Sequence, residues 1–173
     1  GVGYGICSFI PKGDDESRRF LAARLKLAAE ELEQKRQKSD AYVKLARDSA
    51  EYFVKNGKIM KLPEQVPDEL LNTKAGAFVS VHKFGALRGC IGTIAATKEN
   101  LALEIIHNAV CAVSEDPRFE PVKEDELKYL EINVDVLGEA EKIESEAELD
   151  VKKYGVIVQS GYKRGLLLPD LDG

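Results

Sequence analysis

One short stretch of the sequence combines residue types that could do chemistry: Leu87-Arg88-Gly89-Cys90-Ile91-Gly92-Thr93. Cys90 is the nucleophile candidate, and Arg88 lies two residues away, on the same face of a predicted strand. A nearby cation favours the thiolate, and a histidine in reach, here His82 across a hairpin, is the usual partner in thiol catalysis. The stretch therefore predicts a thiol site in which Cys90 and Arg88 are catalytic.

The two glycines of this stretch leave other interpretations open. Gly89 and Gly92 interrupt a strand-like run, which is typical of a bulge or of a close approach by another backbone or a ligand. In one alternative, their backbone N–H groups bind an anionic ligand together with Arg88. In the other, Cys90 is a small buried side chain between glycines and has no chemical role.

A second polar group, Asp116-Pro117-Arg118-Phe119, forms a polar and aromatic corner after a predicted helix. Arg118 is close enough along the chain to pair with Asp116. The predicted ligand-binding residues are accordingly His82, Gly89, Gly92, Thr93, Asp116 and Arg118.

Composition and charge limit the function classes. The 173 residues, 44% apolar and 32% charged, suit one domain or two intimate lobes. A net charge of −5 argues against a nucleic-acid partner, and no apolar run reaches the ~18 residues of a membrane span. The three cysteines have no short spacing, which argues against a disulfide framework and favours a reducing cytoplasm. With only two histidines, a metal centre is also not expected. A metal pair of His107 and Cys111, one helical turn apart, is the weaker interpretation beside a packed thiol.

Alternating and helical patterns predict the elements that position these residues. Residues 77–82 and 87–94 form a β-hairpin in which His82 and Arg88 are cross-strand neighbours. Thr97 caps a helix that runs to about Ser114. Further strands are predicted at 130–136 and, more weakly, at 140–143, and a second hairpin at 154–159 and 165–168. This order predicts an α+β fold with a mainly antiparallel sheet flanked by helices.

The first part of the chain reads differently. Residues 1–12 predict an edge strand, and residues 16–38 a helix with an apolar stripe at Leu21, Leu25, Ala28 and Leu32. The polar end of this helix, residues 33–38, is expected to be solvated. A second helix begins at Ser39 or Asp40 and ends at Asn56-Gly57.

Several motifs together resemble the AMMECR-type domain family, also called AmmeMemoRadiSam system protein A. They are Leu87-Arg88-Gly89-Cys90-Ile91-Gly92-Thr93, Gly76-Ala77-Phe78-Val79-Ser80, Asp116-Pro117-Arg118-Phe119 and Gly165-Leu166-Leu167-Leu168-Pro169-Asp170-Leu171, in the family's order, and the resemblance covers about 40–173. It implies a two-lobed α+β protein whose Arg-Gly-Cys-Ile-Gly segment lines a cleft between the lobes. The implied partners are a radical-SAM protein and a Memo-like protein of the extradiol-dioxygenase superfamily. No cofactor and no reaction are implied.

The sequence departs from the family pattern at both ends. That pattern continues past Gly173, and residues 1–12 weakly resemble the closing strand of a Memo-like domain. We therefore expect a fusion fragment: 1–13 as an edge strand and tail of an upstream domain, 14–38 as a linker helix, and 39–173 as an AMMECR-type domain that is incomplete at its C-terminus. Two functions follow: an enzyme or enzyme accessory that binds a small molecule in the interlobe cleft, or a non-catalytic protein-protein interaction module of the same system.

Overall fold

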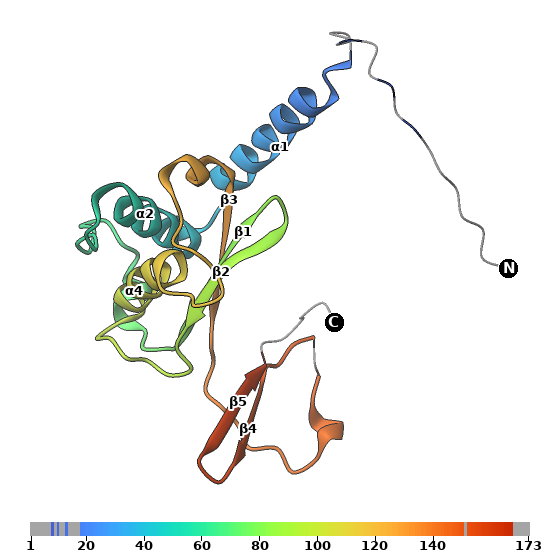
Figure 1. Cartoon of the computed structure of the whole chain (residues 1–173). Coiled ribbons are helices and arrows are strands. Elements are labelled where there is room, and N and C mark those ends of the chain that lie inside the picture. The colour runs from blue at the N-terminus through green and yellow to red at the C-terminus, as the bar shows by residue number, and fades with distance from the viewer. Residues whose placement is uncertain (1–7, 9, 11–12, 14–17, 151, 168–173) are drawn as a thin grey trace, which may run out of the picture. The chain divides into compact units, whose positions relative to one another are not determined.

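The computed structural model describes residues 8, 10, 13, 18–150 and 152–167 (Figure 1). The chain forms two compact units, Gly1–Gly138 and Glu139–Gly173. The predicted edge strand over residues 1–12 falls almost entirely outside the described residues.

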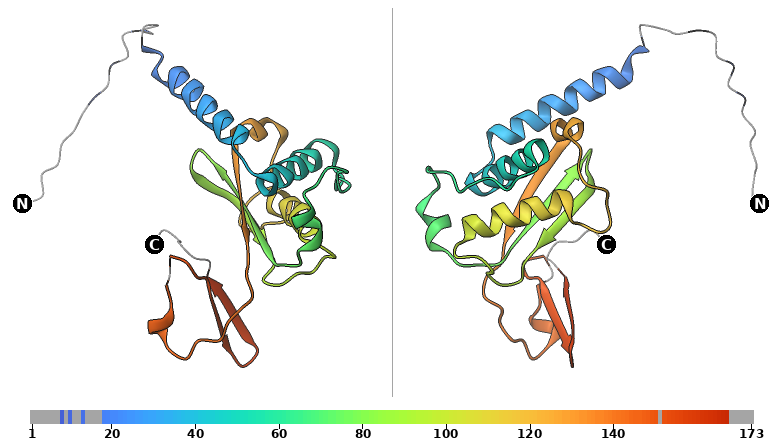
Figure 2. Two further views of the ribbon diagram at one scale, coloured as in Figure 1. Left: turned by 180° about the vertical axis from the view of Figure 1, so that it is seen from behind. Right: turned by 60° about the vertical axis from the view of Figure 1, so that its left-hand side comes forward.

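The first unit is built on a three-stranded antiparallel sheet in the order β2-β1-β3, formed by β1 (Ala77–Lys83), β2 (Ala86–Gly92) and β3 (Leu130–Val136). Helices α2 (Ala41–Asn56) and α4 (Leu101–Ser114) lie on one side of the sheet (Figure 2). Aliphatic side chains fill the space between them, among them Leu45, Val79, Ile105 and Ile132. The α+β prediction is confirmed.

Strand β1 divides its side chains between two environments because alternate residues of a strand point to opposite faces. Ala77, Val79 and Val81 are fully buried in the core shared with α4, whereas Phe78, Ser80 and His82 are half-buried. We call the face that carries these three the outer face. In the register, Cys90 pairs with Ser80. The thiol of Cys90 therefore belongs to the outer face.

The glycines of β2 are required by packing. A Cβ on Gly89 would collide with the main-chain carbonyl oxygen of Ala112 in α4. A Cβ on Gly92 would overlap the ring of Phe78 and would lie 2.7 Å from the carbonyl oxygen of Ala77. The close approach that these glycines predicted is thus made by the protein's own helix and ring.

The hairpin register differs from the predicted one. Phe84 and Gly85, with φ of 54° and 80°, make a two-residue turn, so that Lys83 pairs with Ala86. His82 then pairs with Leu87 and Val81 with Gly89, which leaves Arg88 as the extra residue of a bulge. The prediction that His82 and Arg88 are cross-strand neighbours is therefore wrong, because that pairing needs a three-residue turn, Phe84-Gly85-Ala86, and the turn has only two residues.

Helix ends follow side-chain chemistry at both α2 and α4. The carboxylate of Asp40 accepts from the N–H of Val43 at 2.9 Å, and Gly57 ends α2 with φ of 65°, as predicted. The N-cap of α4 is Asn100, whose side chain accepts from the N–H of Leu103 at 3.0 Å. The predicted cap, Thr97, is wrong, because its hydroxyl donates to Glu104 instead. One short helix, α3 (Asp68–Asn72), precedes β1.

Helix α1 (Phe20–Gln37) buries none of its side chains, and Leu21 of its apolar stripe is 72% exposed. Its polar end makes the contacts instead, since Lys35 pairs with Glu131 at 2.7 Å and Arg36 donates to the carbonyl oxygen of Leu127 at 2.7 Å. Residues 33–38 are exposed except for the half-buried Arg36, so the expectation of a solvated end is confirmed, and two of its cations also bind the protein. Those cations meet acceptors on β3 and on the short 3-10 helix η2 (Glu124–Tyr129).

The second unit is a hairpin of β4 (Val156–Ser160) and β5 (Lys163–Leu167), closed at Gly161, whose φ is 59°. A short 3-10 helix, η3 (Glu146–Glu148), precedes it. Residues 140–143 form no strand, so that prediction is wrong; all four of their side chains are exposed. Among the described residues, no helix is both long and apolar enough to cross a membrane.

Replacing Gly89 by Ala should test the contact between β2 and α4. The added methyl meets a fixed helix carbonyl, so we expect Gly89→Ala to lower the free energy of unfolding by about 2–3 kcal/mol in urea denaturation. Gly138→Ala, where a Cβ meets nothing within 4 Å, is the matched control and should change stability little. Equal stability of the two variants would contradict the packing explanation.

Candidate functional site

The thiol of Cys90 lies beside a hydroxyl on the outer face. Ser80 Oγ donates to Cys90 Sγ at 3.3 Å, and Cys90 is a free, half-buried cysteine. This hydrogen bond orients the sulfur toward Ser80. Sequence reasoning missed Ser80, although its place between the apolar Val79 and Val81 marks it as facing away from the core.

The peptide group of Cys90 is held by two side chains from the corner after α4. Its N–H donates to Asp116 Oδ2 at 2.8 Å, and its carbonyl oxygen accepts from Arg118 Nη2 at 3.2 Å. Because β2 is an edge strand of the sheet, these side chains bond the main-chain groups that a further strand would otherwise bond. The structure thus brings together three of the predicted site residues.

Asp116 and Arg118 also pair with each other, as one interpretation of the sequence held. Arg118 Nη2 donates to Oδ2 of Asp116 at 2.7 Å, and Arg118 Nε donates to Oδ1 at 2.9 Å. These hydrogen bonds from Arg118 hold the pKa of the Asp116 carboxyl well below its ordinary value, against the opposing effect of burial, and the N–H of Cys90 adds to them.

The Arg118 guanidinium interacts with the Cys90 side chain too. Its hydrogen bond to Asp116 raises the pKa of Arg118 most, and its interaction with the Cys90 side chain adds a smaller increase. Arg118, which is bound to the main chain of Cys90, is therefore the cation near this residue, the part for which the sequence suggested Arg88.

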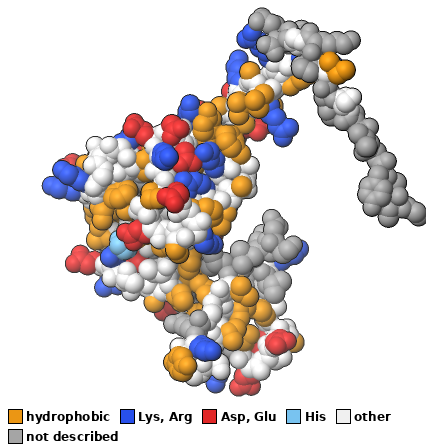
Figure 3. Space-filling view, viewed as in Figure 1, with side chains coloured by type: hydrophobic (Ala, Val, Ile, Leu, Met, Phe, Trp, Pro, Cys, Tyr) orange, Lys and Arg blue, Asp and Glu red, His pale blue; other side chains and the backbone are white. Residues whose placement is uncertain are grey.

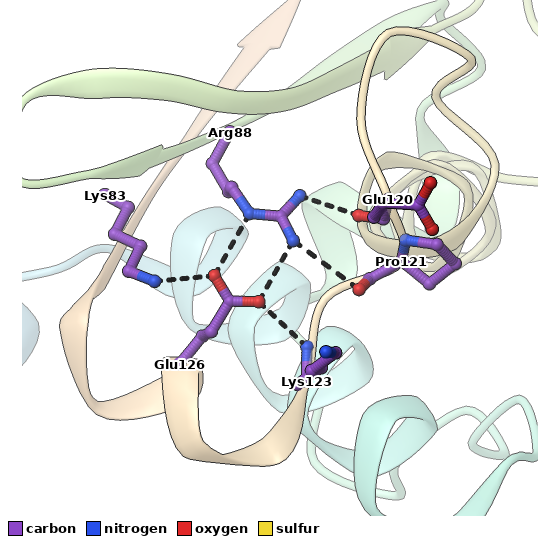
Figure 4. A network of polar contacts seen from close by, with 6 residues as sticks. All are labelled: Lys83, Arg88, Glu120, Pro121, Lys123 and Glu126. Carbon is purple, nitrogen blue, oxygen red and sulfur yellow. Dashed lines mark hydrogen bonds and ion pairs between the residues drawn. The ribbon is translucent and has the colours of Figure 1, made fainter.

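Arg88 is occupied by a different network, shown in Figure 4. Its guanidinium donates to both carboxylate oxygens of Glu126, at 3.1 and 3.0 Å, and to the carbonyl oxygens of Glu120 and Pro121, at 2.8 and 3.5 Å. Lys83 Nζ also donates to Glu126, at 2.7 Å. Four hydrogen bonds to protein acceptors make Arg88 a residue that fixes the hairpin to the segment before β3. Sequence reasoning missed Glu126, which lies in an unremarkable acidic run.

The hydroxyl of Thr93 is also used internally. It donates to Glu104 Oε1 at 2.7 Å and accepts from Asn108 Nδ2 at 3.2 Å. Glu104 is fully buried and accepts further hydrogen bonds from Thr97 and Lys98. Burial raises the pKa of Glu104, but these hydrogen bonds outweigh it and leave the pKa below its ordinary value. Thr93 thus ties β2 to α4 through two buried polar side chains.

His82 is not the residue that faces Cys90 across the hairpin. The cross-hairpin partner of Cys90 is Ser80, and His82 pairs instead with Leu87 and, on the other side, with Glu131. Within the described residues, His82 Nδ1 is buried and has no hydrogen-bond partner. The structure therefore supplies no Cys90–His82 contact.

On α4, the sulfur of Cys111 lies 3.8 Å from His107 Nε2. Burial raises the pKa of the Cys111 thiol to about 11, so that this cysteine stays protonated at neutral pH. In the part of the chain that the structure describes, no group of three or more His, Cys, Asp or Glu side chains is placed to hold a metal ion.

The charge on Glu126 should make stability depend on pH. Its hydrogen bonds with Arg88 lower the pKa of Glu126 from 4.5 to about 2. A lowered carboxyl pKa stabilises the fold fully above pH 4.5, and this contribution is lost as the pH falls toward 2. We expect Glu126→Gln to lower the free energy of unfolding by roughly 2–3 kcal/mol at pH 7 but hardly at pH 2.

Urea denaturation at several pH values would measure this difference. Glu124→Gln, at an exposed position of the same 3-10 helix, is the control and should track the wild type throughout. Asp116, with its own lowered pKa, should leave part of the acid sensitivity in Glu126→Gln. A deficit of the same size at pH 2 and pH 7 would contradict the electrostatic origin.

Comparisons with known proteins agree on one family. The family model described as AMMECR1 matches residues 43–172. A protein of Thermotoga maritima is 53% identical over 133 residues, which cover 76% of each chain. Protein CA_C1420 of Clostridium acetobutylicum is 48% identical over 174 residues; the match takes in 100% of this chain but 36% of that protein. This chain therefore spans about a third of the length of the Clostridium relative.

Among solved structures, the crystal structure of uncharacterized protein PH0010 from Pyrococcus horikoshii matches with a TM-score of 0.69 and 37% identity. The match covers 75% of this chain and 68% of that one. Fold, motif order and sequence identity thus agree, and the chain belongs to the AMMECR1 family.

Proposed function

We propose that the outer-face cluster of Cys90, Ser80 and Arg118 binds a small molecule and that the Cys90 thiol is its reactive group, in an enzyme or enzyme accessory. One observation carries the proposal: a free, half-buried thiol has a hydroxyl at 3.3 Å and an arginine at its side, while its own peptide group is held at both N–H and C=O. A nucleophile held in one position loses little entropy on reaching its target.

The residues around the thiol suit it to nucleophilic attack on carbon. Ser80 donates a hydrogen bond to the sulfur, and neither Ser80 nor Arg118 is a base at neutral pH. Proton removal from the thiol is then left to solvent or to the ligand. Arg88 serves as a positioning residue, because its N–H groups are directed to Glu126 and to main-chain carbonyls.

A partnership with radical-SAM and Memo-like proteins belongs to the same proposal. The family match begins at residue 43, yet the longer Clostridium relative matches the chain over its whole length. Residues before 43 are therefore shared with a protein that holds a further region. This supports an interdomain role for residues 14–38, which include α1, with a Memo-like domain as the proposed neighbour.

A non-catalytic interaction module is the second candidate, and α1 favours it. Phe20, Leu21 and Leu27 of this helix are 72%, 72% and 56% exposed. Hydrophobic side chains lie along the helix in Figure 3. A groove of about 320 Å³ between α1 and the β1–β2 turn is lined by apolar residues, among them Leu25, Leu32, Phe84 and Tyr129, and by the charged Arg24, Glu31, Lys35 and Glu131. Exposed apolar surface of this kind marks many protein contacts.

Mass spectrometry of the purified protein should test the small-molecule function. We expect protein isolated from cells that also make the proposed radical-SAM and Memo-like partners to carry either an adduct on Cys90 or a metabolite released on denaturation. Cys90→Ser should lose it, and Cys111→Ser, which removes a buried thiol, should keep it. Equal retention by Cys90→Ser would contradict a reactive role for Cys90.

Capture of the proposed partner proteins should test the interaction module. If α1 is the contact, Leu21→Asp with Leu25→Asp should reduce capture of the Memo-like or radical-SAM protein at least tenfold, because two carboxylates would enter an apolar contact. Lys26→Asp, on the same helix, is the control for added charge. Capture that is lost with Cys90→Ser and kept with the leucine variants would favour the thiol site instead.

A further inference from the structure

We propose that Arg118 recognises an oxyanion on the ligand, so that the substrate class is an electrophile with a carboxylate or similar group beside the carbon that Cys90 attacks. The proposal rests on the thiol function proposed above and adds the chemical class of its ligand. It is carried by the hydrogen bonds and the exposure of one side chain.

The hydrogen bonds of Arg118 leave one end of its guanidinium available. Nε and Nη2 donate to Asp116, and Nη2 donates also to the carbonyl oxygen of Cys90. Nη1 has no hydrogen-bond partner among the residues that the structure describes. The Arg118 side chain is 55% exposed, whereas that of Asp116 is 3% exposed. The carboxylate of this ion pair is thus buried, whereas its guanidinium is exposed to solvent.

Neighbouring groups fix the direction of this open end. Two oxygens of Asp116 bind the guanidinium as a fork, which sets its plane. The guanidinium carbon lies over the Phe119 ring, 5.5 Å from the ring centroid, so that this ring faces one side of the guanidinium plane. Arg88, by contrast, is only 17% exposed and is saturated by Glu126. Between the two arginines near Cys90, Arg118 is the one with donors to offer a ligand.

Asp116 compensates the positive charge of Arg118, which decides how the recognition works. The pair is close to neutral overall, so its long-range attraction for anions is weak. What remains is the pair of N–H donors on Nη1, carried by a guanidinium that is bound to the main chain of Cys90, and such donors act at hydrogen-bond distance. We therefore expect selectivity between bound reagents rather than fast capture of any anion.

Two alkylating reagents, iodoacetate and iodoacetamide, isolate this selectivity. With either, the Cys90 thiolate attacks the methylene carbon, a C–S bond forms, the C–I bond breaks, and iodide leaves; the thiol proton has already passed to solvent. The reagents differ in a carboxylate against an amide. Both react with the same thiolate, so the ratio of their rates does not depend on how much of the thiol is ionised.

The folded 173-residue chain is treated with each reagent, and the Cys90-containing peptide is quantified by mass spectrometry. The iodoacetate to iodoacetamide rate ratio at Cys90 should be about three- to tenfold higher in the folded protein than in urea. Arg118→Gln should bring the folded ratio down to the urea value. Circular dichroism establishes that the variant is folded.

A measurement on the wild type alone covers the case in which Arg118→Gln unfolds. Inorganic phosphate should slow labelling by iodoacetate at least threefold and leave labelling by iodoacetamide unchanged, at ionic strength matched with chloride. This competition needs no variant, because phosphate would occupy the N–H donors of Arg118.

The outcomes separate the two proposals. If neither reagent labels Cys90 in the folded chain, the thiol is inaccessible and the proposed function itself is overturned. If both reagents label Cys90 with the ratio found in urea, and phosphate has no selective effect, the thiol function stands and anion recognition by Arg118 is overturned.

Discussion

The hydrogen bonds of the buried Asp116 carboxylate are the interactions on which the rest of this site depends. It accepts from the N–H of Cys90 and from the guanidinium and N–H of Arg118, and it is almost fully buried. A charge in that position is tolerable only when its acceptor sites are filled. The same hydrogen bonds that satisfy the carboxylate also hold the edge strand and keep Arg118 against the main chain of Cys90. Stability and site geometry therefore have one cause here.

A division of labour between two arginines follows from their carboxylate partners. Arg88 meets Glu126 together with a lysine and two carbonyl oxygens, which leaves it enclosed. Arg118 pairs with Asp116, and its side chain remains 55% exposed. The residue type is the same, and the number of surrounding acceptors decides which arginine is structural and which can meet a ligand.

The sequence predicted the fold more fully than the site. Alternation in β1 and β3, the caps at Asp40 and Gly57 and the family motifs all led to the observed elements. The choice between Arg88 and Arg118 lay beyond it, because the sequence indicated neither the bulge at Arg88 nor its hydrogen bonds with Glu126, a residue 38 positions away. Ser80 and Glu126 were missed for a related reason: each matters through a neighbour distant in sequence.

Gly89 has a consequence for how the thiol can respond to a ligand. Its Cα rests against the carbonyl of Ala112, α4 ends at Ser114, and Asp116 then returns to the N–H of Cys90. The contacts Gly89–Ala112 and Cys90–Asp116 thereby close a short loop of structure that runs through β2, the end of α4 and the corner after it. The main chain at Cys90 is therefore linked to the end of α4 both through Gly89 and through Asp116. A ligand must therefore fit a cysteine whose main chain is already fixed. A force that displaces this main chain would also be transmitted to the end of α4.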